Sequence, residues 1–218
     1  MPDYRFLVAD DHPLFRGALQ QALSSFGAGC AILEAEDFDG VKALVSKDHD
    51  IDLVLLDLAM PGASGLSGLV ALRGLSPAVP IVVVSAYDDP QNVRRALELG
   101  ASGFISKSAR MDELRKAVKT VLDGGVYTPG GMELGEEGDP ELSELISRIQ
   151  TLTPQQARVL SMLGEGLLNK QIAYELNVSE ATIKAHVSAV LQKLGVDSRT
   201  QAVILLSRIG ASPLSEGA

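Results

Sequence analysis

The sequence has little of what several classes of protein require. It contains one cysteine, Cys30, and no tryptophan, and only 4% of its residues are aromatic. A single cysteine cannot form an intrachain disulfide, and no group of cysteines and histidines has the spacing of a zinc site. We therefore expect Cys30 to be a buried strand thiol, and the cores to consist of Leu, Val, Ile and Ala.

Long hydrophobic runs are also absent. No apolar run approaches the ~18 residues that cross a membrane, and the N-terminus lacks the basic-then-apolar pattern of a secretory signal. The sequence therefore predicts a cytoplasmic protein without a membrane partner.

Basic residues are scarce as well, since the net charge is -9, which at first argues against a nucleic-acid partner. The charge is unevenly distributed, however. Residues 1–125 carry 12 Lys and Arg against 17 Asp and Glu, and residues 126–150 carry 1 against 6. Residues 151–218 carry 6 against 5, so only this last part could approach DNA phosphates without strong repulsion.

The first 125 residues alternate between short apolar runs and helical patterns. The runs are rich in β-branched residues, as in strands buried on both faces, and lie at 5–9, 30–33, 51–56, 80–85 and 103–106. Five strands, each followed by a helix, predict an α/β domain with a five-stranded, parallel, doubly wound (flavodoxin-like) sheet. We place this domain at 1–123.

The remainder of the chain predicts a linker and a small all-α domain. Residues 124–150 form an acidic, Gly-rich linker in which 141–150 could be a short helix. In the domain at 151–210, helices are expected near 154–164, 169–176, 180–194 and 198–208, with Thr153 and Ser179 as N-caps. Residues 211–218 are expected to be a flexible tail.

Polar residues follow four of the predicted strands. Asp10 and Asp11 come after the first strand, Asp57 ends the third, Ser85 ends the fourth and Lys107 follows the fifth. In a parallel sheet these positions converge on one edge. Three carboxylates there favour Mg²⁺, and an Asp carboxylate can be the nucleophile in phosphoryl transfer. Each residue alone is more often a cap, a turn residue or a surface charge; their joint placement points to a site.

Four segments resemble the signatures of a response-regulator receiver domain over residues 1–123: ADDHPLFR (9–16), LLDLAMPGASG (55–65), VVVSAYDD (82–89) and GASGFISKS (100–108). The resemblance implies that Asp57 accepts phosphate from a sensor histidine kinase and that Lys107 pairs with the phosphoryl oxygens. It implies that Ser85 moves to hydrogen-bond the phosphate and that Phe104 follows inward.

The same resemblance implies the Mg²⁺ ligands. They are the carboxylates of Asp10, Asp11 and Asp57 and the backbone carbonyl of Ala59.

A second pattern lies near the C-terminus, where a short helix, a turn at 177–179 and a longer helix predict a helix-turn-helix. One face of the longer helix shows Lys184, Ala185, Ser188 and Gln192, which could read bases in the major groove. Phosphate contacts are predicted at Lys170, Thr182, His186, Lys193 and Arg199. A helical bundle that binds a protein is the alternative interpretation.

LNKQIA, VSEATIKAHV, LQKLGV and SRTQAV resemble the helix-turn-helix of the LuxR/FixJ family. The resemblance implies that Lys184, Ala185 and Ser188 face bases, and it matches Lys170, Thr182 and Lys193 to backbone contacts. It also identifies the last helix, with Val203, Leu206 and Ile209, as a dimerisation helix.

Together the two parts predict a transcriptional response regulator of the NarL/FixJ type. Phosphorylation of Asp57 would promote a homodimer that binds double-stranded promoter DNA. Three alternatives remain: a module that acts only through protein contacts, a DNA binder indifferent to phosphate, and a phosphohydrolase. The phosphohydrolase is disfavoured because Ala59 stands where a second acid would be needed. We therefore expect no enzymatic activity other than slow self-dephosphorylation.

Overall fold

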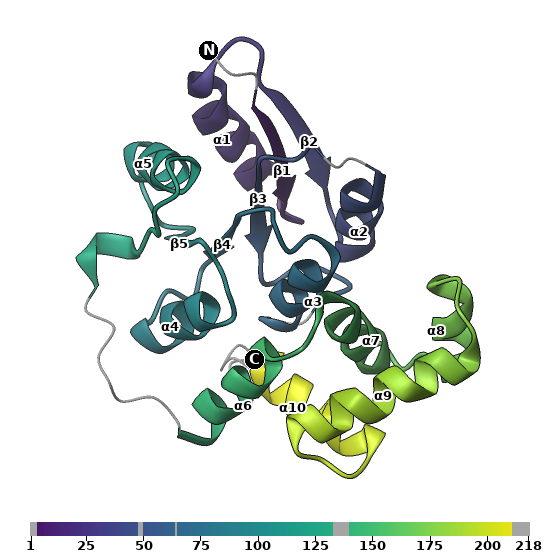
Figure 1. Cartoon of the computed structure of the whole chain (residues 1–218). Helices are drawn as coiled ribbons and strands as arrows, with labels where there is room; N and C mark the ends of the chain where they lie inside the picture. Colours follow the sequence, from purple (N-terminus) through teal and green to yellow (C-terminus); the bar gives the residue numbers. More distant parts are fainter. Residues whose placement is uncertain (1–3, 48–49, 64, 133–139, 211–218) are drawn as a thin grey trace.

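The computed structural model of the chain is drawn in Figure 1 and describes residues 4–47, 50–63, 65–132 and 140–210. Five strands form one parallel sheet in the order β2-β1-β3-β4-β5. They are β1 (Arg5–Ala9), β2 (Ala31–Ala35), β3 (Leu53–Asp57), β4 (Ile81–Ser85) and β5 (Gly103–Ser106). Every residue of β3 and β4 is buried, as expected for apolar strands covered on both faces. The predicted fold class is confirmed.

Helices cover both faces of this sheet. They are α1 (Pro13–Leu23), α2 (Phe38–Lys47), α3 (Ser67–Leu75), α4 (Pro90–Glu98) and α5 (Met111–Leu122), with a short 3-10 helix at Ser24–Phe26. α1 and α5 lie on one side of the sheet, and α2, α3 and α4 lie on the other (Figure 1). The side chains of the two groups form separate buried clusters with the sheet.

Two strand boundaries bear on residues singled out from the sequence. Asp57 ends β3, as predicted, so this carboxylate is the last residue of a fully buried strand. β2 begins at Ala31, so Cys30 precedes the strand and is half-buried. The expectation of a buried strand thiol was wrong because β2 is an edge strand whose residues are mostly half-covered.

The C-terminal part is helical. Its helices are α6 (Pro140–Gln150), α7 (Pro154–Gly164), α8 (Asn169–Glu175), α9 (Glu180–Leu194) and α10 (Arg199–Gly210). The predicted caps are confirmed, since Thr153 accepts a hydrogen bond from the amide of Gln156, and Ser179 accepts one from Thr182. Asn177 adopts a left-handed conformation at φ 51°, which makes the tight turn between α8 and α9.

The segment predicted as a linker is partly built into the structure. Tyr127 forms a parallel bridge with Gly103 of β5, and a 3-10 helix follows at Pro129–Gly131. The possible helix at 141–150 is present as α6, which packs against α4 and α9 through its buried side chains. Residues 133–139 of the predicted linker and the predicted tail at 211–218 lie outside the described residues.

Within the described residues, no helix combines the length and the apolar character needed to span a membrane.

Candidate functional site

The polar residues predicted to converge at the sheet edge do converge there. Asp10 follows β1, Asp57 ends β3, Ser85 ends β4, and Lys107 is the residue after β5. Because all strands are parallel, their carboxyl ends meet at one edge of the sheet. The ends of β1 and β3 lie side by side there, and the ends of β4 and β5 follow next to β3.

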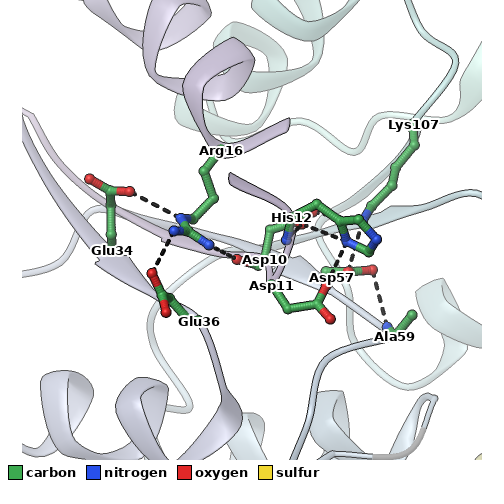
Figure 2. Close-up of polar contacts among 9 residues, drawn as sticks. All are labelled: Asp10, Asp11, His12, Arg16, Glu34, Glu36, Asp57, Ala59 and Lys107. Atoms are coloured by element: carbon green, nitrogen blue, oxygen red, sulfur yellow. Dashed lines mark hydrogen bonds and ion pairs between the residues drawn. The ribbon is translucent and has the colours of Figure 1, made fainter. Parts of the chain in front are cut away.

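Lys107 joins two of the carboxylates. Its Nζ lies 2.8 Å from Oδ2 of Asp57 and 2.8 Å from Oδ2 of Asp10. The other oxygen of Asp57, Oδ1, accepts a hydrogen bond from the amide of Ala59 at 3.1 Å. Asp57 is 2% exposed and Asp10 is fully buried, so these charges interact with little screening by water (Figure 2).

Burial controls the protonation of this cluster. Burial raises the pKa of Asp57 above its ordinary value, and the hydrogen bonds from Lys107 and Ala59 offset only part of this. Burial alone would lower the pKa of Lys107, but its contacts with Asp10 and Asp57 outweigh burial, so this pKa is raised. Lys107 is therefore protonated at neutral pH. A further positive charge nearby would stabilise the ionised form of Asp57.

Four ligand-type side chains gather beside Lys107. Asp10, Asp11, His12 and Asp57 each offer an atom within 4.8 Å of the others. Three carboxylates with one lysine leave an excess of negative charge, and hard oxygen donors suit Mg²⁺. The donor set therefore fits the predicted cation. Ala59 contributes its amide to Asp57, and its carbonyl as a ligand stays a prediction.

Ser85 and Phe104 flank the cluster in different ways. The Ser85 hydroxyl accepts a hydrogen bond from the amide of Tyr87 at 3.1 Å and is almost fully buried beside the β4 end. Phe104 is fully buried and belongs to the same apolar cluster as Val93 and Ala96 of α4. Phe104 is therefore already in an inward position in this structure, and its movement on phosphorylation stays a prediction.

A pocket of about 550 Å³ opens over Asp57. Apolar side chains line much of it, among them Phe15 of α1 and Tyr87, and Leu14 at its rim is 93% exposed. The Asp57 carboxylate therefore lies at the charged base of a pocket whose outer part is mainly apolar.

The helix-turn-helix leaves its predicted DNA face uncovered. Ile172 of α8 and Ile183 of α9 are fully buried in a small core with Val159 and Leu163 of α7. The side chains predicted to read bases are exposed on the opposite side: Lys184, Ala185 and Ser188. Of the predicted phosphate contacts, Lys170 and Thr182 are exposed and His186 is half-buried.

Two other basic residues have internal partners. Lys193 donates to the carbonyl of Thr151 at 2.7 Å and to Oε1 of Gln156 at 2.8 Å, so it ties α9 to the start of α7. Arg199 donates to the carbonyls of Leu163 and Leu167, which caps the end of α7. A phosphate contact by either residue would require these bonds to be released.

Comparison with known proteins agrees with both halves of the chain. The family model described as "Response regulator receiver domain" matches residues 6–119, and that described as "Bacterial regulatory proteins, luxR family" matches residues 150–206. The chain belongs to the response regulators with a LuxR-type DNA-binding domain.

Curated relatives match the chain over nearly their whole length. The glycerol metabolism activator of Pseudomonas putida is 42% identical over 207 residues, which is 92% of this chain and 94% of that protein. The nitrate/nitrite response regulator NarP of Escherichia coli is 35% identical, over 93% of this chain and 94% of NarP. Among solved structures, an RcsB–DNA complex matches with a TM-score of 0.56 and 25% identity, over 97% of this chain and 100% of that one.

In this response regulator the receiver packs closely on the DNA-binding domain (Figure 1). The main contact joins α3 to α7, and α10 also lies against α3. A Cβ added to Gly74 of α3 would lie 3.0 Å from the Cβ of Ala157 and 3.0 Å from the amide nitrogen of Arg158, so the two helices meet where no side chain intervenes. Lys42 of α2 adds an ion pair with Glu165 at 3.3 Å.

The predicted dimerisation helix of the response regulator is part of this closed arrangement. Leu206 and Ile209 of α10 are buried, and Val203 is half-buried beside a 380 Å³ cavity between the domains. Phe38 and Gly68 of the receiver line the same cavity. Much of the apolar face of α10 is therefore covered inside one chain.

Sequence reasoning missed two residues of the receiver site. His12 lies 2.5 Å from Oδ1 of Asp11, measured from its Nδ1. Arg16 is 7% exposed and donates to the backbone carbonyl of Asp10. Both residues could have been found from their place in the sequence, because His12 directly follows Asp10 and Asp11, and Arg16 comes one helical turn after His12.

Replacing Lys107 with methionine should destabilise the response regulator by about 3 kcal/mol at pH 8, because a buried ion pair loses its cation. The loss should shrink as the pH falls towards 5, since the unpaired carboxylates then take up protons. Urea denaturation at both pH values measures the effect, and Mg²⁺ should restore part of the stability.

Lys119→Met is the control, because Lys119 forms an exposed pair with Asp123. Equal losses in the two variants, or a Lys107→Met loss that does not depend on pH, would contradict the role of Lys107.

Proposed function

We propose that Asp57 accepts a phosphoryl group from the phosphohistidine of a sensor kinase, and that this modification controls promoter binding through α9. An oxygen of Asp57 attacks phosphorus, and the bond between phosphorus and the histidine nitrogen breaks with its electron pair staying on that nitrogen. The imidazole, which carries a proton on its other nitrogen, leaves as the neutral ring. Lys107 neutralises charge on the phosphoryl oxygens, and the Ser85 hydroxyl donates to one of them.

Asp10, Asp11, Asp57 and the carbonyl of Ala59 are the proposed holders of Mg²⁺. When bound, the cation would supply positive charge to the phosphoryl oxygens, as Lys107 does. The donor chemistry of the cluster supports this assignment. Turnover of external phosphate esters is not expected, because Ala59 offers no second acid near Asp57.

The output is proposed to be a homodimer bound to double-stranded DNA in the cytoplasm. The receiver (1–123) and the helix-turn-helix domain (151–210) are joined by the segment 124–150. Base contacts are assigned to Lys184, Ala185 and Ser188, and phosphate contacts to Lys170, Thr182, His186 and Lys193. Phosphorylation would free the apolar face of α10 from α3, so that two chains pair and bind two half-sites.

One observation carries the proposal: Lys107 contacts Asp57 and Asp10 beneath an open pocket, in a chain whose α9 exposes its base-reading face. The neighbouring solved structures include RcsB of Salmonella enterica serovar Typhimurium bound to a promoter in the presence of the phosphomimetic BeF3-, at 25% identity and a TM-score of 0.56, over 95% of this chain and 100% of that one. That complex supports a link between receiver chemistry and DNA binding.

Light scattering and DNA-shift titrations with Mg²⁺, with and without beryllofluoride, test the switch. We expect beryllofluoride to raise both the dimer fraction and the DNA affinity, by roughly ten-fold for the affinity. Equal affinity in both conditions would remove the switch and favour a DNA binder indifferent to phosphate. No DNA binding at low salt would favour a module acting through protein contacts.

Two lysine variants should separate base reading from phosphate contact. Lys184→Ala should weaken binding to the target site about ten-fold and leave non-specific binding nearly unchanged. Lys170→Ala should weaken binding to every sequence and lower the slope of log affinity against log salt by about 1. DNA shifts at several salt concentrations measure both.

Lys116→Ala in α5 is the control, because it removes an exposed lysine from the receiver. If Lys184→Ala weakened specific and non-specific binding alike, Lys184 would be a phosphate contact instead.

A further inference from the structure

The polar atoms of Asp10 all lie close to charged or hydrogen-bonding groups, although its Oδ2 makes an ion pair and no hydrogen bond. Its amide donates to the carbonyl of Ala35 at 3.1 Å, and its Oδ1 accepts from the amide of His12 at 2.8 Å. Its Oδ2 lies 2.8 Å from Lys107, and its backbone carbonyl accepts a hydrogen bond from Nη1 of Arg16 at 2.8 Å. The last contact is the one that the phosphoryl chemistry does not explain.

Arg16 is itself held from two sides. Its Nε lies 3.1 Å from Oε2 of Glu34, and its Nη2 lies 2.6 Å from Oε1 of Glu36, both at the end of β2 (Figure 2). The guanidinium presents its donors in a fixed planar fork, so three acceptors in this arrangement leave it one orientation. Figure 2 shows the contacts running from the two glutamates through Arg16 to Asp10 and on to Lys107.

An ion pair with two glutamates does not by itself require a buried arginine. The side chains of Glu34 and Glu36 are 43% and 75% exposed, so a guanidinium could meet them at the surface without losing its water. The side chain of Arg16 is instead only 9% exposed, and burying an arginine costs free energy that its contacts must offset. The contact made possible by this burial is the one with the Asp10 carbonyl.

Holding that carbonyl has a consequence for the next residue. The peptide unit is planar, so fixing the carbonyl of Asp10 also fixes the amide of Asp11 and the direction in which its side chain leaves the backbone. Asp10 and Asp11 supply adjacent carboxylates to the proposed Mg²⁺ cluster. Since two glutamates neutralise Arg16, its effect on this cluster comes from geometry and not from charge.

We propose that Arg16 is a positioning residue for the cation site, which fixes the Asp10–Asp11 peptide so that both carboxylates point into the cluster, while Glu34 and Glu36 fix Arg16. This inference rests on the proposed Mg²⁺ site. It assigns a role to residues that do not touch the cation or the phosphoryl group.

Isothermal titration of the full chain with MgCl₂ tests the inference. We expect Arg16→Met to raise the Mg²⁺ dissociation constant by about ten-fold or more, as loss of an orienting partner does at other metal sites. Arg16→Lys should weaken binding nearly as much, because lysine keeps the charge and loses the fork. The labelling rate with acetyl phosphate should recover largely at saturating Mg²⁺, since Asp57 and Lys107 are unchanged.

Arg115→Met is the matched control, because it removes an arginine that pairs with Asp112 on α5. Circular dichroism checks that each variant is folded. If Arg16→Met does not fold, the double variant Glu34→Gln/Glu36→Gln decides, since it keeps Arg16 and removes the carboxylates that orient it. We expect this variant to weaken Mg²⁺ binding several-fold.

Three results would overturn the inference: an unchanged dissociation constant in folded Arg16→Met, full rescue by Arg16→Lys, or unchanged binding in the double glutamate variant when Arg16→Met is unfolded. Failure of the wild-type chain to bind Mg²⁺ is a different result, because it would reject the proposed cation site itself.

Discussion

Replacing Asp57 with alanine should abolish labelling of the chain by a phosphodonor and leave its DNA affinity the same with or without beryllofluoride. Asp57 is the carboxylate that lies under the open pocket with Lys107 on one oxygen and the Ala59 amide on the other. No neighbouring carboxylate has the same two partners: Asp10 is fixed by Lys107 and His12. Phosphate labelling and DNA shifts on the same preparation measure both effects.

The stability of an Asp57→Asn variant adds a second, independent readout. Burial raises the pKa of Asp57, so the folded state disfavours its ionised form. The wild type therefore loses stability relative to the variant as the pH rises through this raised pKa, and the two converge at low pH. We expect Asp57→Asn to be more stable than the wild type at pH 8 and to differ less at pH 5.

Asp52→Ala is the control for both measurements, because Asp52 is exposed and accepts a hydrogen bond from the amide of Arg5 at the far end of the sheet. If Asp57→Ala were labelled as strongly as Asp52→Ala, the phosphate would be on another residue. This result would contradict the proposed mechanism.

The sheet and the carboxylate cluster could be predicted from the sequence because both follow from local signals. Short β-branched runs mark strands, and the parallel connection forces their carboxyl ends to one edge. Asp10, Asp57 and Lys107 therefore meet as expected, although they are up to 97 positions apart in the sequence. Helix caps at Thr153 and Ser179 were equally local, and they fixed the starts of α7 and α9.

Residues that depend on tertiary packing could not be predicted in this way. The hydrogen bonds of Lys193 in α9 to Thr151 and Gln156 are an example, and the predicted phosphate contact of Lys193 stays a prediction that requires their release. The burial of Phe104, where α4 packs on β5, is a second example, and its predicted movement stays a prediction. Neither the hydrogen bonds of Lys193 nor the burial of Phe104 could be predicted from residue spacing or composition, because both depend on which helices pack together.

The contact of α3 with α7 is the clearest case. Gly74, Ala157 and Gly164 are small residues on helices of two domains, and nothing in their spacing says that they face each other. Only the folded chain shows that backbone atoms of α7 lie where a side chain of residue 74 would begin.

Replacing Gly74 with leucine should therefore open the closed arrangement. A Cβ at this position would lie 3.0 Å from the Arg158 amide nitrogen and 3.2 Å from the Pro154 carbonyl oxygen, and backbone atoms cannot rotate away as a side chain does. Leucine also favours helix over glycine by about 0.5–1 kcal/mol, so α3 itself should not be weakened. The strain falls on the contact between the domains.

Opening this contact should release α10. Its Leu206 and Ile209 are buried in the closed chain, and they become available for a second copy once α3 withdraws. We expect Gly74→Leu to increase the radius of gyration in small-angle scattering, and to raise dimer fraction and DNA affinity without a phosphodonor, by roughly ten-fold for the affinity. Gly17→Leu in α1 is the control, because nothing lies within 4 Å of a Cβ added there.

Combining Gly74→Leu with Asp57→Ala distinguishes release of the domains from chemistry at the carboxylate. If phosphorylation acts by separating α3 from α7 and α10, the double variant should bind DNA as tightly as Gly74→Leu alone, because the separation no longer depends on phosphate. If the double variant instead binds as weakly as the wild type without a phosphodonor, Asp57 acts on DNA binding by a route other than this interface. An expanded chain that stays monomeric, with unchanged DNA affinity, would show that the interface holds the domains together without restraining α10.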